Sequence, residues 1–254
     1  MFRTLILATA LALPAVGAHA SLRALYTFEG NFNDVSGNAL HAVAGGVGPV
    51  FATGFEGQGA SFNGLNDYLT VALDVNPSAM PAMTWGAWVA PTDASPIRQV
   101  LSHDNGGFDR SIGIDSRGAA GTGFAAFNGV GVSRVGGEPA LGSWTFLAAR
   151  YDQSSGAMTF WVNDASVSLT SNFGSGNSFL RIASNPAFVE YFAGSIDNVF
   201  IFDQALSDSQ IASIRTGGAA AVMAVPEPEV AALMLGGLAV VGWAARRRRP
   251  VVPA

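Results

Sequence analysis

Short runs in which apolar and polar side chains alternate recur along most of the chain. These runs are rich in Val, Ile, Phe, Trp and Thr, and clusters of Gly, Asn, Asp and Ser separate them. A period of two turns one face of each run toward a core, so the pattern predicts antiparallel strands in a two-sheet sandwich. The runs cover residues 22–28, 67–73, 83–89, 98–102, 111–115, 123–127, 144–151, 158–162, 179–183 and 195–202.

Turn and capping residues indicate where several of these elements begin and end. Residues 152–156 and 163–164 separate consecutive runs, and their residue types tolerate the positive φ of a tight hairpin. Residues 207–210, with the sequence SDSQ, form a capping box that is followed by apolar residues on one helical face. The pattern therefore predicts one short helix that stops at Gly217.

The N-terminal segment has the pattern of an export signal. Residues 1–20 combine Arg3, an apolar run and the small-x-small triplet at positions 18–20. The apolar run is too short to span about 30 Å of hydrocarbon, which argues against a membrane helix. We therefore expect cleavage before Ser21 and export from the cytoplasm.

A second apolar segment lies close to the C-terminus. Residues 230–245 carry no charge and would form a helix of about 24 Å, short for a membrane span. Trp243 and the flanking arginines extend its reach, and the basic tail should stay in the cytoplasm. Because the segment is apolar all round, an amphipathic core helix does not fit it. The chain thus divides into a signal peptide at 1–20, a domain at 21–217, a linker at 218–225 and a segment at 226–249 with a transmembrane helix at about 230–245.

The composition of the exported part excludes several chemistries. Residues 21–224 hold eight Arg against sixteen Asp and Glu, and the whole chain has no Cys and no Lys. Thiol catalysis, thiolate metal sites and Schiff-base chemistry are therefore excluded. An acidic surface with scattered arginines does not suit phosphate binding, so we expect no nucleic-acid partner.

The C-terminal segment holds three parts in order: a Pro-Glu-Pro motif, a short apolar helix and an arginine cluster. This arrangement resembles the PEP-CTERM sorting signal of Gram-negative bacteria that make exopolysaccharide. The resemblance implies transient anchoring in the inner membrane, cutting near the motif by the peptidase exosortase, and release to the cell surface or matrix. The residues that carry the signal are Pro226, Glu227, Pro228, Arg246, Arg247, Arg248 and Arg249.

Five motifs between Leu22 and about Gly217 occur in the order found in one all-β family. They are LYTFEGNFNDVSGNALHA, GFEGQGASFNGLNDYLTV, MTWGAWVAP, GSWTFLAARYDQSSGAMTFWVND and YFAGSIDNVFIFDQALSDSQI. With them the chain resembles LamG-like (concanavalin A-like lectin/glucanase) domains. The resemblance implies an all-β, antiparallel two-sheet jelly-roll sandwich with one short C-terminal helix. The chain departs from the family at the hairpin of residues 163–164, usually Asp-Gly, and at Thr145 and Phe146, where histidines are common.

Glucanases of this superfamily carry paired carboxylates at alternate positions of one strand, one as nucleophile and one as acid. No such cluster occurs in this chain, and a Gly-x-Ser-x-Gly nucleophile elbow is also missing. We therefore expect that the protein is not an enzyme.

Oxygen donors are concentrated just after the first expected strand, at Asn31, Asn33, Asp34, Ser36 and Asn38. Asp197 opens the last expected strand, and first and last strands commonly neighbour each other in such sandwiches. Asp34 and Asp197 are therefore candidate ligands that would share one structural Ca²⁺ with backbone carbonyls, as LamG-like and related jelly rolls often do. The alternative is an Asx-rich turn and a strand-end aspartate, both bonded to backbone N–H groups.

The loop of residues 103–111 is the candidate ligand site. Sugar binding uses a stacking aromatic ring and a few planar donors and acceptors, which this loop supplies; the alternative is a solvated turn. Trp85 and Trp88 are three residues apart in one expected strand, so they should point to opposite faces and at least one should be core. The candidate ligand residues are Asp104, Asn105, Phe108, Asp109 and Arg110.

These features together predict an exported, non-catalytic module that binds exopolysaccharide or another matrix glycan near the cell surface. One alternative is a structural or adhesive matrix protein without a small ligand. A second is a glycan-active hydrolase with an unfamiliar site.

Overall fold

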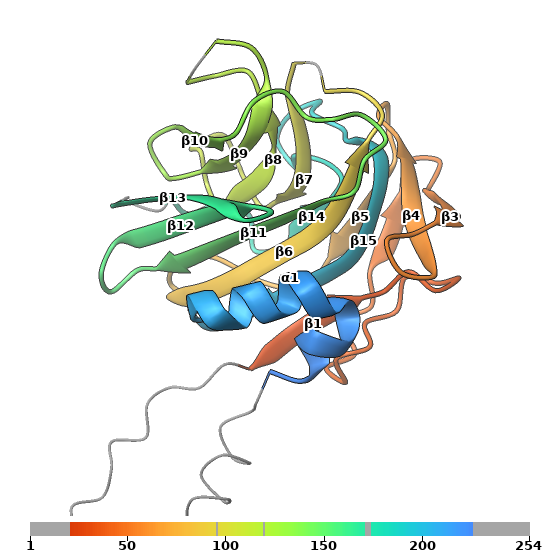
Figure 1. The fold of residues 1–254 in the computed structure, drawn as a ribbon, viewed down its shortest axis with the longest axis horizontal. Helices are drawn as coiled ribbons and strands as arrows, with labels where there is room; N and C mark the ends of the chain where they lie inside the picture. The colour runs from red at the N-terminus through yellow and green to blue at the C-terminus, as the bar shows by residue number, and fades with distance from the viewer. Residues whose placement is uncertain (1–20, 95, 119, 171–173, 226–254) are drawn as a thin grey trace, which may run out of the picture.

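Two antiparallel sheets stack face to face to form a sandwich, with one helix on the outside (Figure 1). The computed structural model describes residues 21–94, 96–118, 120–170 and 174–225. The larger sheet runs in the order β13 (Ala165–Thr170), β12 (Ala157–Val162), β11 (Thr145–Asp152), β6 (Ala82–Pro91), β15 (Ala193–Phe202), β4 (Gln58–Asn63) and β3 (Val50–Thr53), with β1 (Leu22–Tyr26) also paired to β15. The smaller sheet runs in the order β10 (Val132–Val135), β9 (Gly123–Phe127), β8 (Ser111–Asp115), β7 (Arg98–Ser102), β14 (Leu180–Ile182), β5 (Tyr68–Val71) and β2 (Val43–Gly45).

Every run predicted from the alternating pattern contains a strand, and the two-sheet antiparallel sandwich is confirmed. The pattern missed β2, β3, β4, β10 and β13. Four of these five lie at the edges of the two sheets, where most side chains are exposed or only half-buried. An edge strand needs no continuous apolar face, so alternation is weak there. The fifth, β4, lies inside the larger sheet, and Phe62 is the one large side chain among its buried residues.

The main core fills the space between the two sheets. Trp85 is fully buried in it and packs edge-on against Tyr151, with ring centroids 6.3 Å apart. Trp88 points to the other face of β6, where it is 2% exposed and belongs to a second apolar cluster. The prediction of opposite faces is therefore correct, and both tryptophans are core residues.

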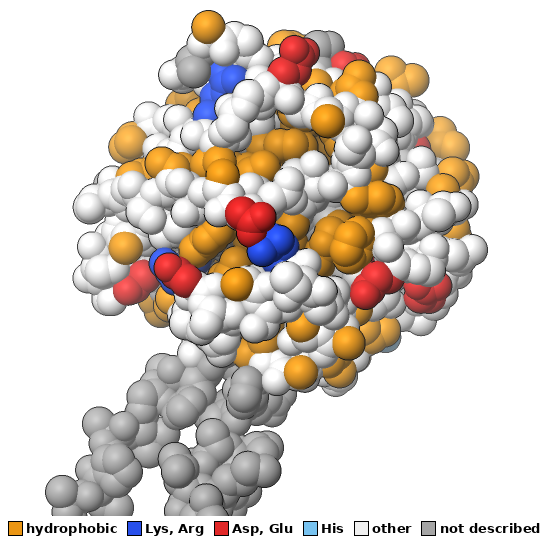
Figure 2. Space-filling model, in the orientation of Figure 1, with side chains coloured by type: hydrophobic (Ala, Val, Ile, Leu, Met, Phe, Trp, Pro, Cys, Tyr) orange, Lys and Arg blue, Asp and Glu red, His pale blue; other side chains and the backbone are white. Residues whose placement is uncertain are grey.

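The second cluster lies on the outer face of the larger sheet, under helix α1 (Asp208–Met223). Figure 2 shows hydrophobic side chains exposed on this face around the helix. Ile211, Ile214 and Val222 are the buried side chains that the helix contributes, and they pack with Leu25, Phe200 and their neighbours. Both faces of the larger sheet thus carry a buried apolar cluster.

Helix α1 begins where the capping box predicted, but it ends later than predicted. Ser207 accepts from the backbone N–H of Gln210, and the reciprocal bond from Ser207 N–H to Gln210 completes the capping box. Gly217 does not stop the helix: Gly218 adopts a φ of 58°, which kinks it, and helical structure resumes to Met223. Residues 218–223, predicted as linker, are therefore part of the folded domain.

Two further predictions about local structure are confirmed. Asn163 has a φ of 52°, as a tight hairpin between β12 and β13 requires, and its side chain accepts from the N–H of Phe146. The first and last strands are neighbours, since β1 pairs with β15 along the register Tyr26 to Val199.

The predicted signal peptide at 1–20 and the predicted transmembrane helix at about 230–245 lie outside the described residues. Within the part of the chain that the structure describes, no helix combines the length and apolar character needed to cross a bilayer.

Docking of α1 on the sheet can be tested with one pair of variants. Ile214 is fully buried under the helix, so Ile214→Ala should lower the free energy of unfolding by about 2–5 kcal/mol. Ser213 is exposed one position earlier, and Ser213→Ala should change it by less than about 0.5 kcal/mol. Denaturant unfolding of both variants measures the difference. Equal, small losses would show that the helix does not stabilise the sandwich.

Candidate functional site

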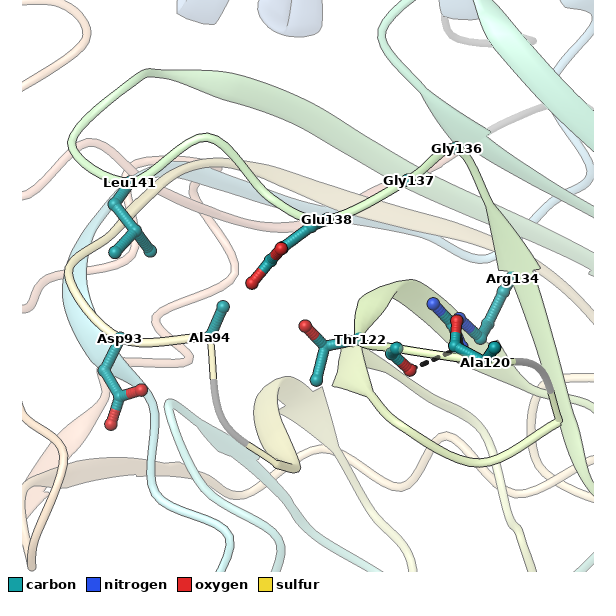
Figure 3. A pocket seen from close by; sticks show the side chains of 10 residues that line it. Asp93, Ala94, Ala120, Thr122, Arg134, Gly136, Gly137, Glu138 and Leu141 are labelled. Carbon is teal, nitrogen blue, oxygen red and sulfur yellow. Dashed lines mark hydrogen bonds between the residues drawn. The ribbon is translucent and has the colours of Figure 1, made fainter.

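An open cleft of about 710 Å³ lies where three loops meet at one end of the sandwich. The β6–β7 loop supplies Asp93 and Ala94, and the β8–β9 loop supplies residues 120–122. Residues 136–138 and Leu141 come from the β10–β11 loop, and Arg134 comes from β10 itself. Figure 3 shows that side chains from all three loops surround one open space.

Glycine and arginine give the cleft its shape. Gly121 and Gly136 have φ angles of 72° and 75°, in a region that a residue with a Cβ rarely adopts. Arg134 donates from Nη1 to the carbonyl of Gly121 at 2.9 Å and so ties the β8–β9 loop to β10. Glycine turns therefore shape the loops, and the Arg134 side chain fixes one of them to β10.

The polar side chains of the cleft divide into two kinds. Asp93 forms an ion pair with Arg98, whose Nη1 also donates to the carbonyls of Gly64 and Tyr191. Asp93 is thus part of the framework. Glu138 is exposed, and Figure 3 shows its carboxylate directed into the open space with the Thr122 side chain across from it.

These side chains suit recognition of a sugar. A carboxylate accepts hydrogen bonds from two neighbouring hydroxyls, and a threonine hydroxyl can both donate and accept. Leu141, which is 56% exposed, adds an apolar surface for the C–H face of a ring. The arrangement can bind a polyhydroxylated ligand through Glu138, Thr122 and Leu141.

The predicted ligand loop is built differently from the expectation. Asp104, Asp109 and Arg110 are only 2%, 1% and 1% exposed. Asp104 accepts from the N–H of Asp109 at 3.0 Å and from the Asn185 side chain at 3.0 Å. These groups form their hydrogen bonds within the protein, because a buried charge is tolerated only when it is paired and hydrogen-bonded.

The remaining contacts of the loop support this correction. Arg110 donates from Nη1 to the carbonyls of Val75 and Met80, both at 2.8 Å, and burial lowers its pKa to about 10. Asp109 accepts from the N–H of Asn105 at 3.1 Å. The geometry therefore gives Asp104, Asp109 and Arg110 structural roles as loop organisers.

Two of the five predicted ligand residues do reach the surface. Asn105 is exposed and Phe108 is half-buried, with its ring 5.4 Å from that of Phe127. The guanidinium of Arg117 lies 5.1 Å from the Phe108 ring and pairs with Asp115. Neither Asn105 nor Phe108 lines the cleft.

Sequence reasoning missed the residues of the cleft. They come from three separate loops and share no motif, and most are small. One signal was present: residues 134–139, RVGGEP, place a Gly-Gly pair beside charged residues between two strands. A glycine pair of this kind marks a loop whose polar neighbours are free to face solvent.

The candidate metal ligands occupy two hydrogen-bonding environments. The Asp34 carboxylate accepts from the N–H groups of Leu25 at 3.0 Å, Ser36 at 2.8 Å and Leu40 at 3.1 Å. The Asp197 carboxylate accepts from the N–H of Glu56 at 3.0 Å and of Asn198 at 2.7 Å. These partners match the alternative of aspartates that bond to backbone N–H groups.

A shared Ca²⁺ would need about six to eight oxygen ligands. Within the described residues, no three His, Asp or Glu side chains gather in a way that could hold a metal ion. The N–H groups also direct hydrogen atoms at the carboxylate oxygens that a cation would require. Backbone N–H groups thus already satisfy the carboxylates of Asp34 and Asp197, which favours the alternative of two capping aspartates, and the shared Ca²⁺ stays a prediction.

The two aspartates differ in how their environment shifts the pKa. Burial raises the pKa of Asp34, but the hydrogen bonds from Leu25, Ser36 and Leu40 outweigh it, so the net pKa lies below its ordinary value. At Asp197 burial dominates and raises the pKa to about 6, despite hydrogen bonds from Glu56 and Asn198. Asp197 therefore holds its charge at a cost in stability.

Comparisons with known proteins agree with this architecture. A family model described as the concanavalin A-like lectin/glucanases superfamily matches residues 62–212, and a PEP-CTERM protein-sorting motif matches residues 224–249. Both resemblances drawn from the sequence are thus confirmed. A search of curated protein sequences gave no match.

Solved structures share the fold. Domain 4 of AbnA, an extracellular arabinanase from Geobacillus stearothermophilus, in complex with arabinotriose, has a TM-score of 0.64 at 22% identity, covering 78% of this chain and 99% of that domain. The binding domain of Paraclostridial Mosquitocidal Protein 1 has a TM-score of 0.59 at 15% identity, and that of botulinum neurotoxin serotype D 0.57 at 11%. These matches cover 77% and 78% of this chain and 52% of each of those chains.

Calcium dependence can be tested on the exported domain. We expect the same melting temperature in millimolar Ca²⁺ and in chelator, because backbone N–H groups already satisfy Asp34 and Asp197. Thermal unfolding followed by circular dichroism measures it. A lower melting temperature in chelator that disappears in Asp34→Ala and in Asp197→Ala would establish the shared ion instead.

The raised pKa of Asp197 predicts a pH effect. The folded protein binds this proton more tightly than the unfolded chain does, so the contribution of Asp197 to stability falls as pH rises from about 5 to about 7. Between these two pH values, the contribution of Asp197 to the free energy of unfolding falls by roughly 1 kcal/mol. In Asp197→Asn this component should be missing, and denaturant unfolding at both pH values measures it.

Comparison with the parent protein isolates the effect of Asp197. Burial lowers the pKa of His103 to about 4, so His103 opposes the effect, but it is present in both proteins and cancels. Asp34→Asn is the matched control, since a lowered carboxyl pKa changes stability only in more acidic solution. An identical pH dependence in the parent and in Asp197→Asn would contradict the prediction.

Proposed function

The chain belongs to the concanavalin A-like lectin/glucanases superfamily and carries a PEP-CTERM sorting motif, and on that premise we propose that it is an exported, non-catalytic module that binds a matrix glycan. The cleft between the β6–β7, β8–β9 and β10–β11 loops carries the proposal. It is open, it is large enough for one or two sugar rings, and it combines polar side chains with an apolar one.

The placement of the cleft supports a role at a surface. In Figure 1 the loops that carry the cleft lie at the top of the sandwich, and the chain leaves α1 at the bottom. A domain held in the inner membrane by its C-terminal segment would therefore present the cleft away from the bilayer. After cutting by exosortase, the same cleft would be free to bind exopolysaccharide or another glycan of the cell surface or matrix.

Charge indicates which glycans fit. The exported part carries eight Arg against sixteen Asp and Glu, and Glu138 faces into the cleft. A polyanionic polysaccharide would meet repulsion both at long range and in the cleft. Neutral sugars, whose hydroxyls donate to Glu138 and pair with Thr122, are the ligand class that the cleft favours.

Related structures add support by analogy. The arabinanase domain with this fold is described in complex with arabinotriose, a neutral oligosaccharide, and the two toxin domains are described as binding domains. Extending sugar binding from those proteins to this one is part of the proposal, because such low identity carries the fold alone.

The absence of catalysis is proposed from the acidic residues of the cleft. A retaining glycosidase needs two carboxyl groups about 5–5.5 Å apart across the sugar, one as nucleophile and one as acid. The acidic side chains that line this cleft are Asp93 and Glu138, and Asp93 is engaged by Arg98. Glu138 alone can bind a hydroxyl but cannot supply both roles.

A glycan array with the exported domain tests the proposal. We expect binding to neutral polysaccharides, with at least tenfold weaker affinity in Glu138→Gln and in Thr122→Val. Glu138→Gln replaces a charged acceptor oxygen by an NH2 donor, and Thr122→Val removes the hydroxyl. Glu29→Gln is the control, since Glu29 is exposed and does not line the cleft. Titration calorimetry with the strongest glycan measures the affinities.

The alternatives give different results in the same experiment. Silence on every glycan, including the host's own exopolysaccharide, would favour a structural or adhesive matrix protein. Release of sugar from a bound glycan, lost in Glu138→Gln, would establish a hydrolase.

A further inference from the structure

The sorting motif follows the folded domain without a free linker. Helix α1 ends at Met223, and the motif matches from residue 224. Val222 is 1% exposed, and Val225 packs against the apolar cluster on the outer face of the larger sheet. The chain is therefore attached to the domain surface up to the residue before Pro226.

The last part of α1 is held by a side chain from a distant turn. Glu56 lies in the turn between β3 and β4, and its Oε2 accepts from the N–H of Ala219 at 2.9 Å. The same oxygen accepts from the Asn198 side chain at 2.6 Å. Glu56 thus caps the helical segment that begins after the kink, where free N–H groups favour a carboxylate.

The kink itself leaves space for this carboxylate. Gly218 has a φ of 58°, and a Cβ at this position would lie 2.1 Å from Oε1 of Glu56. A residue with a side chain here would both strain the backbone and displace the cap. The sequence therefore provides a glycine where the helix must bend toward Glu56.

Peptidases commonly bind their substrates as extended chains, because backbone hydrogen bonds to an extended segment supply the affinity. Before Pro226, residues 219–223 are helical and Val225 is docked on the sheet, so this segment cannot be extended while Val222 and Val225 remain in place. We propose that residues 219–225 are a latch, held by Glu56 and Val222, that limits access of the sorting peptidase until it opens.

The latch is suited to open without unfolding the domain. It is short, it lies at the end of the chain and it begins at a kink, while most of the buried side chains of α1 precede Gly218. Such a segment opens locally with a smaller free energy than global unfolding. The rate of processing would then follow the fraction of time for which the latch is open.

The full chain, produced in cells that carry the matching peptidase, tests the proposal. Glu56→Ala removes the cap but keeps the backbone N–H that donates to Asp197. We expect the uncut form to disappear at least fivefold faster than in the parent, as measured by pulse-chase labelling. Val222→Ala should act in the same direction, since it removes the buried contact of the latch.

Glu29→Ala is the matched control. Its carboxylate accepts from the N–H of Gln58, the first residue of β4, and makes no hydrogen bond to α1 within the described residues, so processing should keep the parental rate. An eight-residue Gly-Ser insertion between Met223 and Ala224 supplies free chain and keeps the matched motif intact. With the insertion, we expect rapid processing that Glu56→Ala no longer accelerates.

The proposal is overturned if Glu56→Ala and Val222→Ala are processed at the parental rate, or if the insertion leaves processing unchanged. Hydrogen exchange gives a second measure of latch opening, made on the uncut chain in membranes from cells that lack the peptidase. Amides of residues 219–225 should exchange faster in Glu56→Ala than in Glu29→Ala. Equal exchange would show that Glu56 does not hold the segment. The outcome is independent of glycan binding, because it depends only on the sorting motif.

Discussion

The larger sheet has apolar side chains on both faces, and the rest of the structure follows from the need to bury both. Strand β6 shows this most directly, since Trp85 enters the core between the sheets and Trp88 enters the cluster under α1. The smaller sheet covers one face, and the helix covers part of the other. Because Ile211, Ile214 and Val222 of α1 are buried in this outer cluster, the chain leaves the domain from a docked helix.

The same burial requirement explains where binding chemistry can lie. Packing occupies the middle of both sheets, so exposed polar groups with freedom to meet a ligand are found in the loops at the ends of the strands. The polar loop of residues 103–111 is the exception, because Asp104 and Arg110 are buried. Asp104 accepts from the backbone N–H of Asp109, and Arg110 donates to the carbonyl of Val75. The glycine-rich loops around Glu138 line an open cleft instead.

The sequence predicted features that depend on local periodicity and capping. Alternation located every buried strand except β4, and the SDSQ box at 207–210 located the start of α1. The sequence could not show that the helix bends at Gly218 and continues, because that outcome depends on Glu56, which lies far away in the chain. It also assigned Asp104, Asp109 and Arg110 to a ligand, since polar residue types alone do not distinguish a solvent-facing group from a buried one. The cleft was missed because its residues meet only in three dimensions.

One chain of contacts joins the interior of the larger sheet to the point where the sorting motif begins. Asp197 is buried in β15, and its carboxylate accepts from the N–H of Glu56, which fixes the β3–β4 turn over the strand. The side chain of that same residue then reaches Asn198 and Ala219. A buried carboxyl whose pKa is raised to about 6 is a cost that packing alone would not require. Its position is understandable because it holds the turn that carries the cap of α1, so the sheet, the turn and the end of the domain are stabilised together.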